Sequence, residues 1–208
     1  MAPKVVIMDC DGVILESVDV KTRAFAALFA AYGPETADQA VAHHLRNGGI
    51  SRFEKFRFVY RELLRRPLSP QLEQELGERF THLCFEGVLA AGFVPGAMEF
   101  IAAAGRVVPL YVASGAPEEE LRSIFEARDL ARHFRGVFGS PATKPEIIER
   151  ILALEGASPG QAVMIGDSAT DLEAALAAGT GFFGRGEFPG KPCAPDLFGL
   201  FNRLFPAV

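Results

Sequence analysis

The chain has 208 residues, 49% of them hydrophobic, which is enough for one good core with a smaller unit inserted into it. Its 21 basic and 26 acidic residues give a net charge of −5, which would repel a phosphate backbone, so we expect no nucleic-acid partner. Three scattered cysteines favour neither a disulfide framework nor a zinc site, and the first apolar run stops at Asp9, so we expect no membrane span and a cytoplasmic protein.

The first predicted element is a strand over about residues 4–9, followed by Asp9-Cys10-Asp11-Gly12. While the chain stays extended, alternate side chains share a face, so Asp9 and Asp11 should project the same way and reach one small ligand. Two like charges at this spacing do not ionise independently, so one carboxylate is expected to stay charged and the other to be pushed toward protonation. The alternative is a strand that ends in an ordinary Asp-Gly turn.

The next 70 or so residues show helical periodicity and no strand candidate. The predicted helices cover residues 18–32, 37–46, 51–65 and 69–89. We interpret this stretch as a helical cap domain, residues 16–91, inserted into a core domain of residues 1–15 and 92–208.

Beyond the cap, short apolar runs alternate with helical segments. The predicted strands cover residues 107–113, 135–139, 162–166 and 180–183. The predicted helices cover residues 117–127, 145–154 and 171–178, with a short one within 197–205. This alternation predicts an α/β fold, a Rossmann-like parallel sheet core that carries the inserted all-helical cap.

Polar groups follow several of these strands, at the edge where open α/β sheets bind ligands. Ser114 and Gly115 precede a helix, and free amides there suit phosphate oxygens, although Ser114 could simply be the helix N-cap. Lys144 precedes another helix, where a cation gains nothing from the helix dipole, which favours a role beyond local stability. The alternative is an ordinary solvent-exposed lysine.

Two more carboxylates, Asp167 and Asp171, stand at a strand-to-helix turn. With Asp9 and the backbone carbonyl of Asp11 they would form an oxygen-rich site typical of Mg²⁺. Separately, each could be an ordinary strand-end or helix-start residue, but their occurrence in order with the other segments favours one shared site.

These four segments make the chain resemble the haloacid dehalogenase superfamily of phosphohydrolases over nearly its full length. The resemblance implies that Asp9 is the nucleophile and forms an aspartyl-phosphate, while Asp11 is the general acid and then the base. The residues that it implies for the transferring phosphoryl group are Ser114, Gly115 and Lys144. The residues that it implies for the Mg²⁺ site are Asp9, Asp11, Asp167 and Asp171.

Within the cap, residues 47–52 read Asn-Gly-Gly-Ile-Ser-Arg and resemble the cap segment of beta-phosphoglucomutase relatives. In those relatives the arginine grips a second, non-reacting phosphate or acidic group. By this resemblance Arg52, with Gly49 and Ser51, is the candidate specificity segment. The alternative is a helix N-cap at Ser51 beside a surface arginine. The four histidines match no catalytic motif and are predicted to be surface or packing residues.

The predicted function is therefore a Mg²⁺-dependent phosphohydrolase that cleaves a small phosphorylated metabolite, of phosphosugar or phosphoglycolate type. One alternative is a phosphosugar mutase of the beta-phosphoglucomutase type. Another is a catalytically inactive binding module, which would show decay of at least one motif. We expect a monomer or weak dimer whose partner is the small metabolite.

Overall fold

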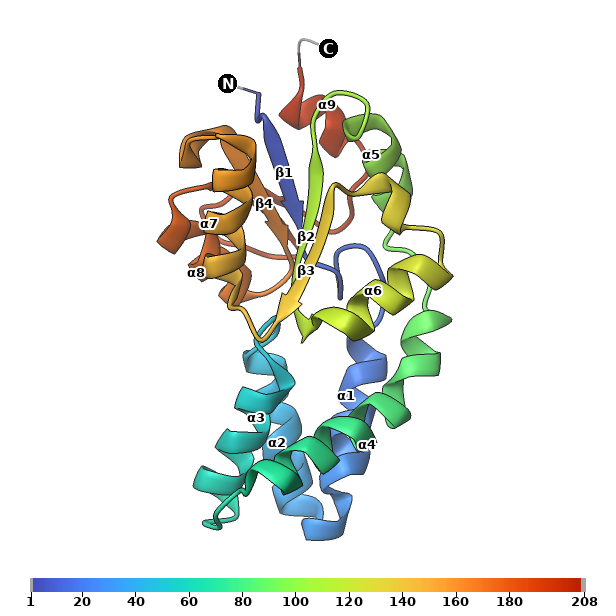
Figure 1. The fold of residues 1–208 in the computed structure, drawn as a ribbon, viewed down its shortest axis with the longest axis vertical. Coiled ribbons are helices and arrows are strands. Elements are labelled where there is room, and N and C mark those ends of the chain that lie inside the picture. The colour runs from blue at the N-terminus through green and yellow to red at the C-terminus, as the bar shows by residue number, and fades with distance from the viewer. Residues whose placement is uncertain (1, 207–208) are drawn as a thin grey trace.

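The structure is a computed structural model that describes residues 2–206 (Figure 1). In this part of the chain six parallel strands form one sheet in the order β3-β2-β1-β4-β5-β6. The strands are β1 (Val5–Met8), β2 (Leu110–Pro117), β3 (Gly136–Ser140), β4 (Ala162–Gly166), β5 (Gly181–Arg185) and β6 (Cys193–Ala194). The five predicted strands and the parallel α/β class are confirmed, and only the two-residue edge strand β6 was not predicted.

Helices cover both faces of this sheet (Figure 1). The core helices are α5 (Ala97–Ala104), α6 (Glu118–Ala127), α7 (Lys144–Glu155), α8 (Ala169–Ala178) and α9 (Leu200–Leu204), with 3₁₀ turns η3 (Ala131–His133) and η4 (Pro159–Gln161). Side chains alternate along β1, so that Val6 and Met8 pack in one apolar layer and Val5 and Ile7 in the other. The first layer includes residues of α5, α6 and α9, and the second includes residues of α7 and α8.

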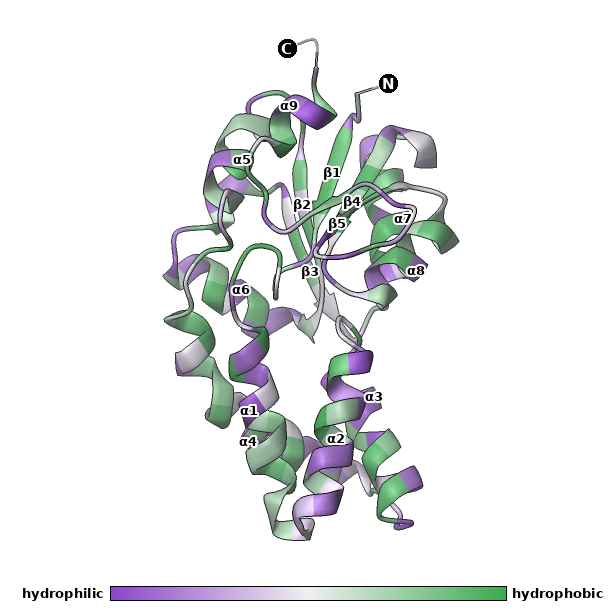
Figure 2. Cartoon of the chain, turned by 180° about the vertical axis from the view of Figure 1, so that it is seen from behind, coloured by the Kyte–Doolittle hydropathy of each residue, from purple (hydrophilic) through white to green (hydrophobic). Residues whose placement is uncertain are grey.

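Four helices lie together beyond the carboxyl ends of the strands, and we call them the cap helices (Figure 1). They are α1 (Val18–Phe29), α2 (Pro34–Arg46), α3 (Arg52–Phe58) and α4 (Pro70–Leu89), with a 3₁₀ turn η1 (Ala30–Tyr32) and a π-helical turn η2 (Val59–Leu63). Their apolar sides face one another and bury an aromatic cluster of Phe25, Phe29, Phe56 and Phe80 (Figure 2). This aromatic cluster is continuous with the apolar layer that contains Val6 and Met8 of β1.

Local sequence signals set several helix ends in the cap. Gly33 has a φ of 96°, which suits glycine, and Pro34 occupies the first turn of α2. Ser69 caps α4 by accepting a hydrogen bond from the N–H of Leu72. The helix predicted over residues 51–65 is shorter than expected, because α3 passes into the π-helical turn.

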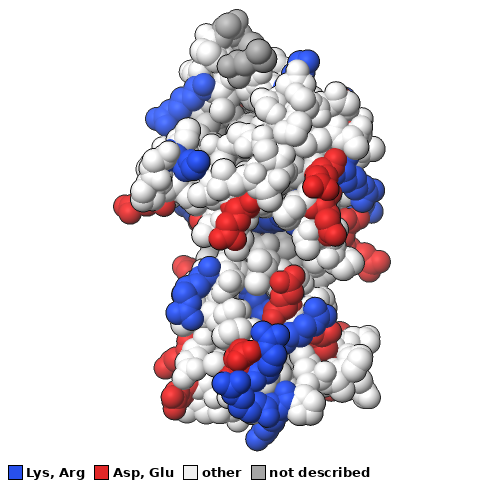
Figure 3. Space-filling view, turned by 90° about the vertical axis from the view of Figure 1, so that its left-hand side faces the viewer, with Lys and Arg blue, Asp and Glu red and all other residues white. Residues whose placement is uncertain are grey.

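Helix α5 was not predicted. Its sequence, Ala-Met-Glu-Phe-Ile-Ala-Ala-Ala, is only eight residues long and mostly apolar, and a run of this length does not by itself distinguish a helix from a strand. None of the described helices is long and apolar enough to cross a membrane. On the face shown in Figure 3, acidic and basic side chains are intermixed, and basic ones gather toward the cap.

Candidate active site

The strand ends bring the predicted core residues to one edge of the sheet. Asp9 directly follows β1, Ser114 lies near the end of β2, and Asp167 directly follows β4. Because β1 lies between β2 and β4, these three segments are neighbours at the carboxyl edge. Lys144 starts α7 and reaches the same place, with 2.9 Å between its Nζ and Oδ2 of Asp9. The four predicted segments therefore meet.

Asp9 is a buried carboxylate held by two donors. Its Oδ1 accepts a hydrogen bond from the backbone N–H of Cys10 at 2.7 Å, and its Oδ2 faces Lys144. Burial raises the pKa of Asp9 to about 7 against the opposing effect of Lys144, and the nearby charges of Asp171 and Asp11 add to the rise. The chain thus concentrates negative charge at the end of β1, where a cation would be strongly favoured.

Lys144 is the cation that the core itself supplies. Its side chain is 5% exposed and pairs with both Asp9 and Asp171. Although burial alone would lower the pKa of Lys144, the carboxylates of Asp171 and Asp9 raise it above its usual value, so the side chain stays charged. Asp171 is fully buried, and its second oxygen accepts hydrogen bonds from the N–H and hydroxyl of Ser168. Asp171 thereby fixes Lys144 against Asp9.

The carboxylates of Asp9, Asp167 and Asp171 suit a hard divalent cation. Their oxygens lie within 4.8 Å of one another. Asp167 lines the cavity described below, and no hydrogen-bond donor or cation within the described residues pairs with its carboxylate. Burial, followed by the charges of Asp9 and Asp171, raises the pKa of Asp167 to about 8. An all-oxygen donor set with this excess of negative charge fits Mg²⁺.

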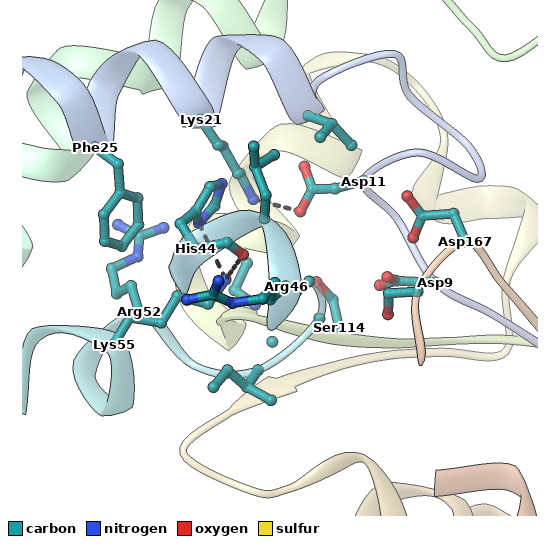
Figure 4. A pocket seen from close by; sticks show the side chains of 18 of the residues that line it. Asp9, Asp11, Lys21, Phe25, His44, Arg46, Arg52, Lys55, Ser114 and Asp167 are labelled. Carbon is teal, nitrogen blue, oxygen red and sulfur yellow. Dashed lines mark hydrogen bonds and ion pairs between the residues drawn. The ribbon is translucent and has the colours of Figure 1, made fainter. Parts of the chain in front are cut away.

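Asp11 lies in the same cavity but is bound from the cap side (Figure 4). Lys21 of α1 forms an ion pair with it, and the hydroxyl of Ser17 donates a hydrogen bond at 2.5 Å. Although burial opposes it, Lys21 lowers the pKa of Asp11. The two pKa values therefore differ, but in the opposite sense to the roles that the resemblance implies, because the raised value belongs to Asp9 and the lowered one to Asp11. Nothing in the sequence spacing singles out Lys21.

Ser114 and Gly115 lie within β2, which continues to Pro117, and Pro117 is the N-cap of α6. Ser114 is therefore not the helix N-cap that the sequence left open. A Cβ added to Gly115 would collide with the backbone of Gly49 and Ile50, so the cap loop lies directly against this turn. The cap is closed over the core in this structure.

The cap segment predicted to control specificity lies at this junction. Ser51 is the N-cap of α3, as the alternative reading proposed, but Arg52 is not a surface residue. Its side chain is 4% exposed and forms an ion pair of 2.7 Å with Glu120 of α6. It also donates to the hydroxyl of Thr81 at 2.8 Å and lies over the ring of Phe80.

Core and cap together enclose a cavity of about 300 Å³ (Figure 4). From the core it is lined by acidic and phosphate-binding candidates, among them Asp9, Asp11, Ser114, Gly115 and Asp167. From the cap it is lined by Gly49 and by basic groups that include Lys21, His44, Arg46, Arg52 and Lys55. Lys21 and Lys55 were not predicted to line the site, and His44 was predicted to be a surface or packing residue, because ordinary helix positions give no motif.

The comparisons with known proteins agree with this arrangement. A family model described as haloacid dehalogenase-like hydrolase matches residues 3–179. Phosphoglycolate phosphatase 1 of Pseudomonas aeruginosa is 26% identical over an alignment of 193 residues, and the match covers 85% of this chain and 67% of that protein. The phosphoglycolate phosphatase of Rhodospirillum rubrum is 28% identical over an alignment of 185 residues, and the match covers 85% of this chain and 77% of that protein.

Solved structures show the same fold. CbbY from Rhodobacter sphaeroides in complex with phosphate superposes with a TM-score of 0.72 at 22% identity, over 95% of this chain and 96% of that chain. A predicted phosphoglycolate phosphatase from Haemophilus somnus superposes with a TM-score of 0.66 at 18% identity, over 87% of this chain and 84% of that chain.

Proposed function

The chain belongs to the haloacid dehalogenase-like hydrolases and is a phosphatase, and from this premise we propose that it cleaves a small phosphomonoester through a covalent intermediate on Asp9 with the help of Mg²⁺. The observation that carries the proposal is the convergence at one buried point of Asp9, its cationic partner Lys144 and the unpaired carboxylate of Asp167. A strand-end turn without catalytic use would not bury the carboxylates of Asp9 and Asp171 around a single lysine, with a third carboxylate, half-buried, beside them.

In the first step, a carboxylate oxygen of Asp9 attacks phosphorus and the bond to the ester oxygen breaks. Asp11 gives its proton to that leaving oxygen, and the negative charge of the entering phosphate favours the protonated form of Asp11. Lys21 and Ser17 hold the Asp11 carboxyl in place. In the second step, Asp11 takes a proton from water, the water oxygen attacks phosphorus, and the bond to Asp9 breaks to release phosphate.

The remaining core residues neutralise and orient the transferring group. Lys144 and the turn at Ser114 and Gly115 would contact the phosphoryl oxygens, where charge develops in the transition state. Mg²⁺ held by Asp9 and Asp167, with Asp171 beside them, would supply positive charge against the carboxylates and the phosphate. Closure of the cap would exclude water from the first step.

The cavity sets the size of the substrate. Its volume of about 300 Å³ is at the lower end of the range for ligand pockets, which suits a small metabolite. Two relatives are named phosphoglycolate phosphatases, so we propose a substrate of the phosphoglycolate type ahead of a phosphosugar. Of the cap segment expected to control specificity, Gly49 and Arg52 line this cavity, and Ser51 between them in the chain caps α3.

A phosphate-release screen tests the proposal. Purified protein is incubated with 2-phosphoglycolate, phosphosugars and nucleotides, with Mg²⁺ or with a chelator. We expect Mg²⁺-dependent release from small phosphomonoesters, with 2-phosphoglycolate among the best. Conversion of a hexose 1-phosphate to the 6-phosphate without release would instead establish the mutase alternative, and no reaction with any compound would refute the proposed function.

A further inference from the structure

The positive charge of Arg52 is already used within the protein. Its guanidinium pairs with Glu120 and donates to Thr81, while the hydroxyl of Thr81 donates to the second oxygen of Glu120 at 2.7 Å. All three side chains are at least partly buried. A second anionic group on a substrate would have to compete with a buried carboxylate for this arginine.

Lys55 of α3 is in a different position. Its side chain is 3% exposed, its Nζ lies on the cap side of the cavity, and no carboxylate of the described residues lies within ion-pair distance of it. Its only hydrogen-bond partners in the described residues are Nδ1 of His44 at 3.1 Å and the backbone carbonyl of His44 at 3.4 Å (Figure 4). A buried ammonium with no counter-ion is costly, so its retention calls for a use.

His44 is the hydrogen-bond partner of Lys55 on the cap side of the cavity. Its ring stacks on Phe25, with 4.3 Å between ring centroids, so its orientation is fixed. When Lys55 is protonated, its ammonium donates to Nδ1, and the neutral imidazole then carries its proton on Nε2. Burial and the charge of Lys55 lower the pKa of His44 to about 3, which keeps it neutral. Nε2 has no partner among the described residues and is a free donor in a side chain that lines the cavity.

We infer that Lys55 and His44 form the binding site for a second anionic group of the substrate, and that Arg52 acts mainly by joining the cap to Glu120. This inference rests on the proposed function, since it names the part of the same cavity that reads the far end of the phosphomonoester. Lys55 supplies the charge, and His44 orients Lys55 and offers an N–H donor. Asp9 and Asp167 make the core end of the cavity acidic, whereas Lys55 leaves the cap end basic.

This polarity selects a class of substrate. A phosphate that binds at the core end places the other end of a small molecule against the cap, because the cavity is only about 300 Å³. A carboxylate there would meet Lys55 and supply the counter-ion that the protein lacks. A neutral hydroxyl would leave the buried charge unpaired. The substrate is therefore expected to be a small phosphomonoester that carries a carboxylate.

The test compares two molecules of similar size, 2-phosphoglycolate and 2-hydroxyethyl phosphate, which differ in having a carboxylate or a hydroxyl. Phosphate release is measured for the wild type, Lys55→Met, Lys55→Gln and Arg52→Ala. Arg23→Met is the matched control, because Arg23 is an exposed cap cation outside the cavity. The readout is the ratio of kcat/KM for the two compounds, which a general loss of folding or closure would not change.

We expect each Lys55 variant to lower this ratio by about 10- to 100-fold, the loss of one charge-assisted hydrogen bond. Arg52→Ala should lower kcat/KM for both compounds alike, and Arg23→Met should leave the ratio as in the wild type. A ratio within twofold of the wild type in the Lys55 variants would overturn the inference. So would a fall of the ratio in Arg52→Ala alone.

A binding measurement separates this inference from the proposed function. In an Asp9→Asn background with Mg²⁺, calorimetry gives the dissociation constants of both compounds with and without Lys55→Met. If the wild type released phosphate from neither compound, the proposed function would fail. The binding ratio would still decide the role of Lys55, with the same 10- to 100-fold expectation.

Discussion

Arg52 of the cap and Glu120 of the core form a buried ion pair, with 2.7 Å between Nη2 and Oε1. The pair joins α3 to α6, and Thr81 of α4 bonds to both partners. Although burial opposes it, Arg52 lowers the pKa of Glu120, so the carboxylate stays charged. Since the two residues come from opposite sides of the cavity, the pair favours the closed arrangement.

Glu120→Gln should weaken this closure and destabilise the protein. The variant keeps the shape of the side chain but leaves the Arg52 charge buried without a counter-ion, which costs about 3 to 5 kcal/mol. For a chain of this size we expect the melting temperature to fall by about 6 °C or more. Thermal unfolding measures it, with Glu126→Gln on the exposed face of the same helix as control. Equal melting temperatures for the two variants would show that the pair contributes nothing.

Asp9→Asn should abolish turnover without unfolding the protein. The amide cannot act as the nucleophile, so we expect kcat to fall by at least about 10³-fold. The fold should tolerate the change, because burial already disfavours the charge of Asp9 and raises its pKa to about 7. Steady-state kinetics measure the loss of turnover, and thermal unfolding measures whether the fold is retained. Substantial activity in the variant would disprove the covalent mechanism.

Asp167→Asn should remove the response of the protein to Mg²⁺. In the wild type, Mg²⁺ should raise the melting temperature, because a ligand that binds only the folded state stabilises it by mass action. The variant, measured in a chelator, should melt no lower than the wild type, since Asp167 is an unpaired carboxylate. Asp38→Asn, at an exposed cap position, serves as control. A Mg²⁺ shift that persists in Asp167→Asn would place the ion elsewhere.

Lys55→Met should stabilise the protein while it impairs selectivity. Burial, then Lys21, lowers the pKa of Lys55 to about 7, against the partial support of Asp11 and Asp9. Below pH 7 the folded protein carries the full cost of this charge, so we expect the variant to melt about 5 °C or more above the wild type. A lower melting temperature in the variant would indicate a structural lysine.

The difference in melting temperature between Lys55→Met and the wild type should depend on pH, because the pKa of Lys55 is lowered in the folded protein. The folded-state pKa of about 7 lies below the ordinary value of 10.5. Between these values the unfolded chain binds the proton and the folded chain does not, so the wild type gains stability as the pH rises. The advantage of Lys55→Met should therefore be largest below pH 7 and vanish toward pH 10.5. Melting curves across this range measure the difference.

Gly115→Ala should prevent the cap from closing fully. The added Cβ would collide with the backbone of Gly49 and Ile50, which cannot move aside without moving the cap loop. Because small misplacements of catalytic groups are costly, we expect kcat/KM to fall by about 10- to 100-fold. Gly160→Ala is the control, since a Cβ there meets no atom within 4 Å. Equal activity in both variants would contradict the closed arrangement as the active one.

The core and its candidate site could be predicted from the sequence because they follow from local rules. An apolar run that ends in Asp9, or in Asp167, is a strand with its polar residue at the carboxyl end. Parallel strands then bring those ends together whatever the rest of the chain does. The fold class and five strands were confirmed in this way. Helix α5 was missed because an apolar run of eight residues does not by itself distinguish a helix from a strand.

The cap side of the cavity was decided only by the tertiary structure. Lys21, His44 and Lys55 occupy ordinary helical positions, and their sequence neighbours do not reveal that they face Asp11, Phe25 or the cavity. Arg52 could be picked out as a cation near flexible backbone, but its partner Glu120 is 68 positions away in the chain. The site residues at the ends of the strands can be recognised from a few neighbouring residues in the sequence. The pairing of charges between the cap helices and the core depends on contacts between residues far apart in the chain.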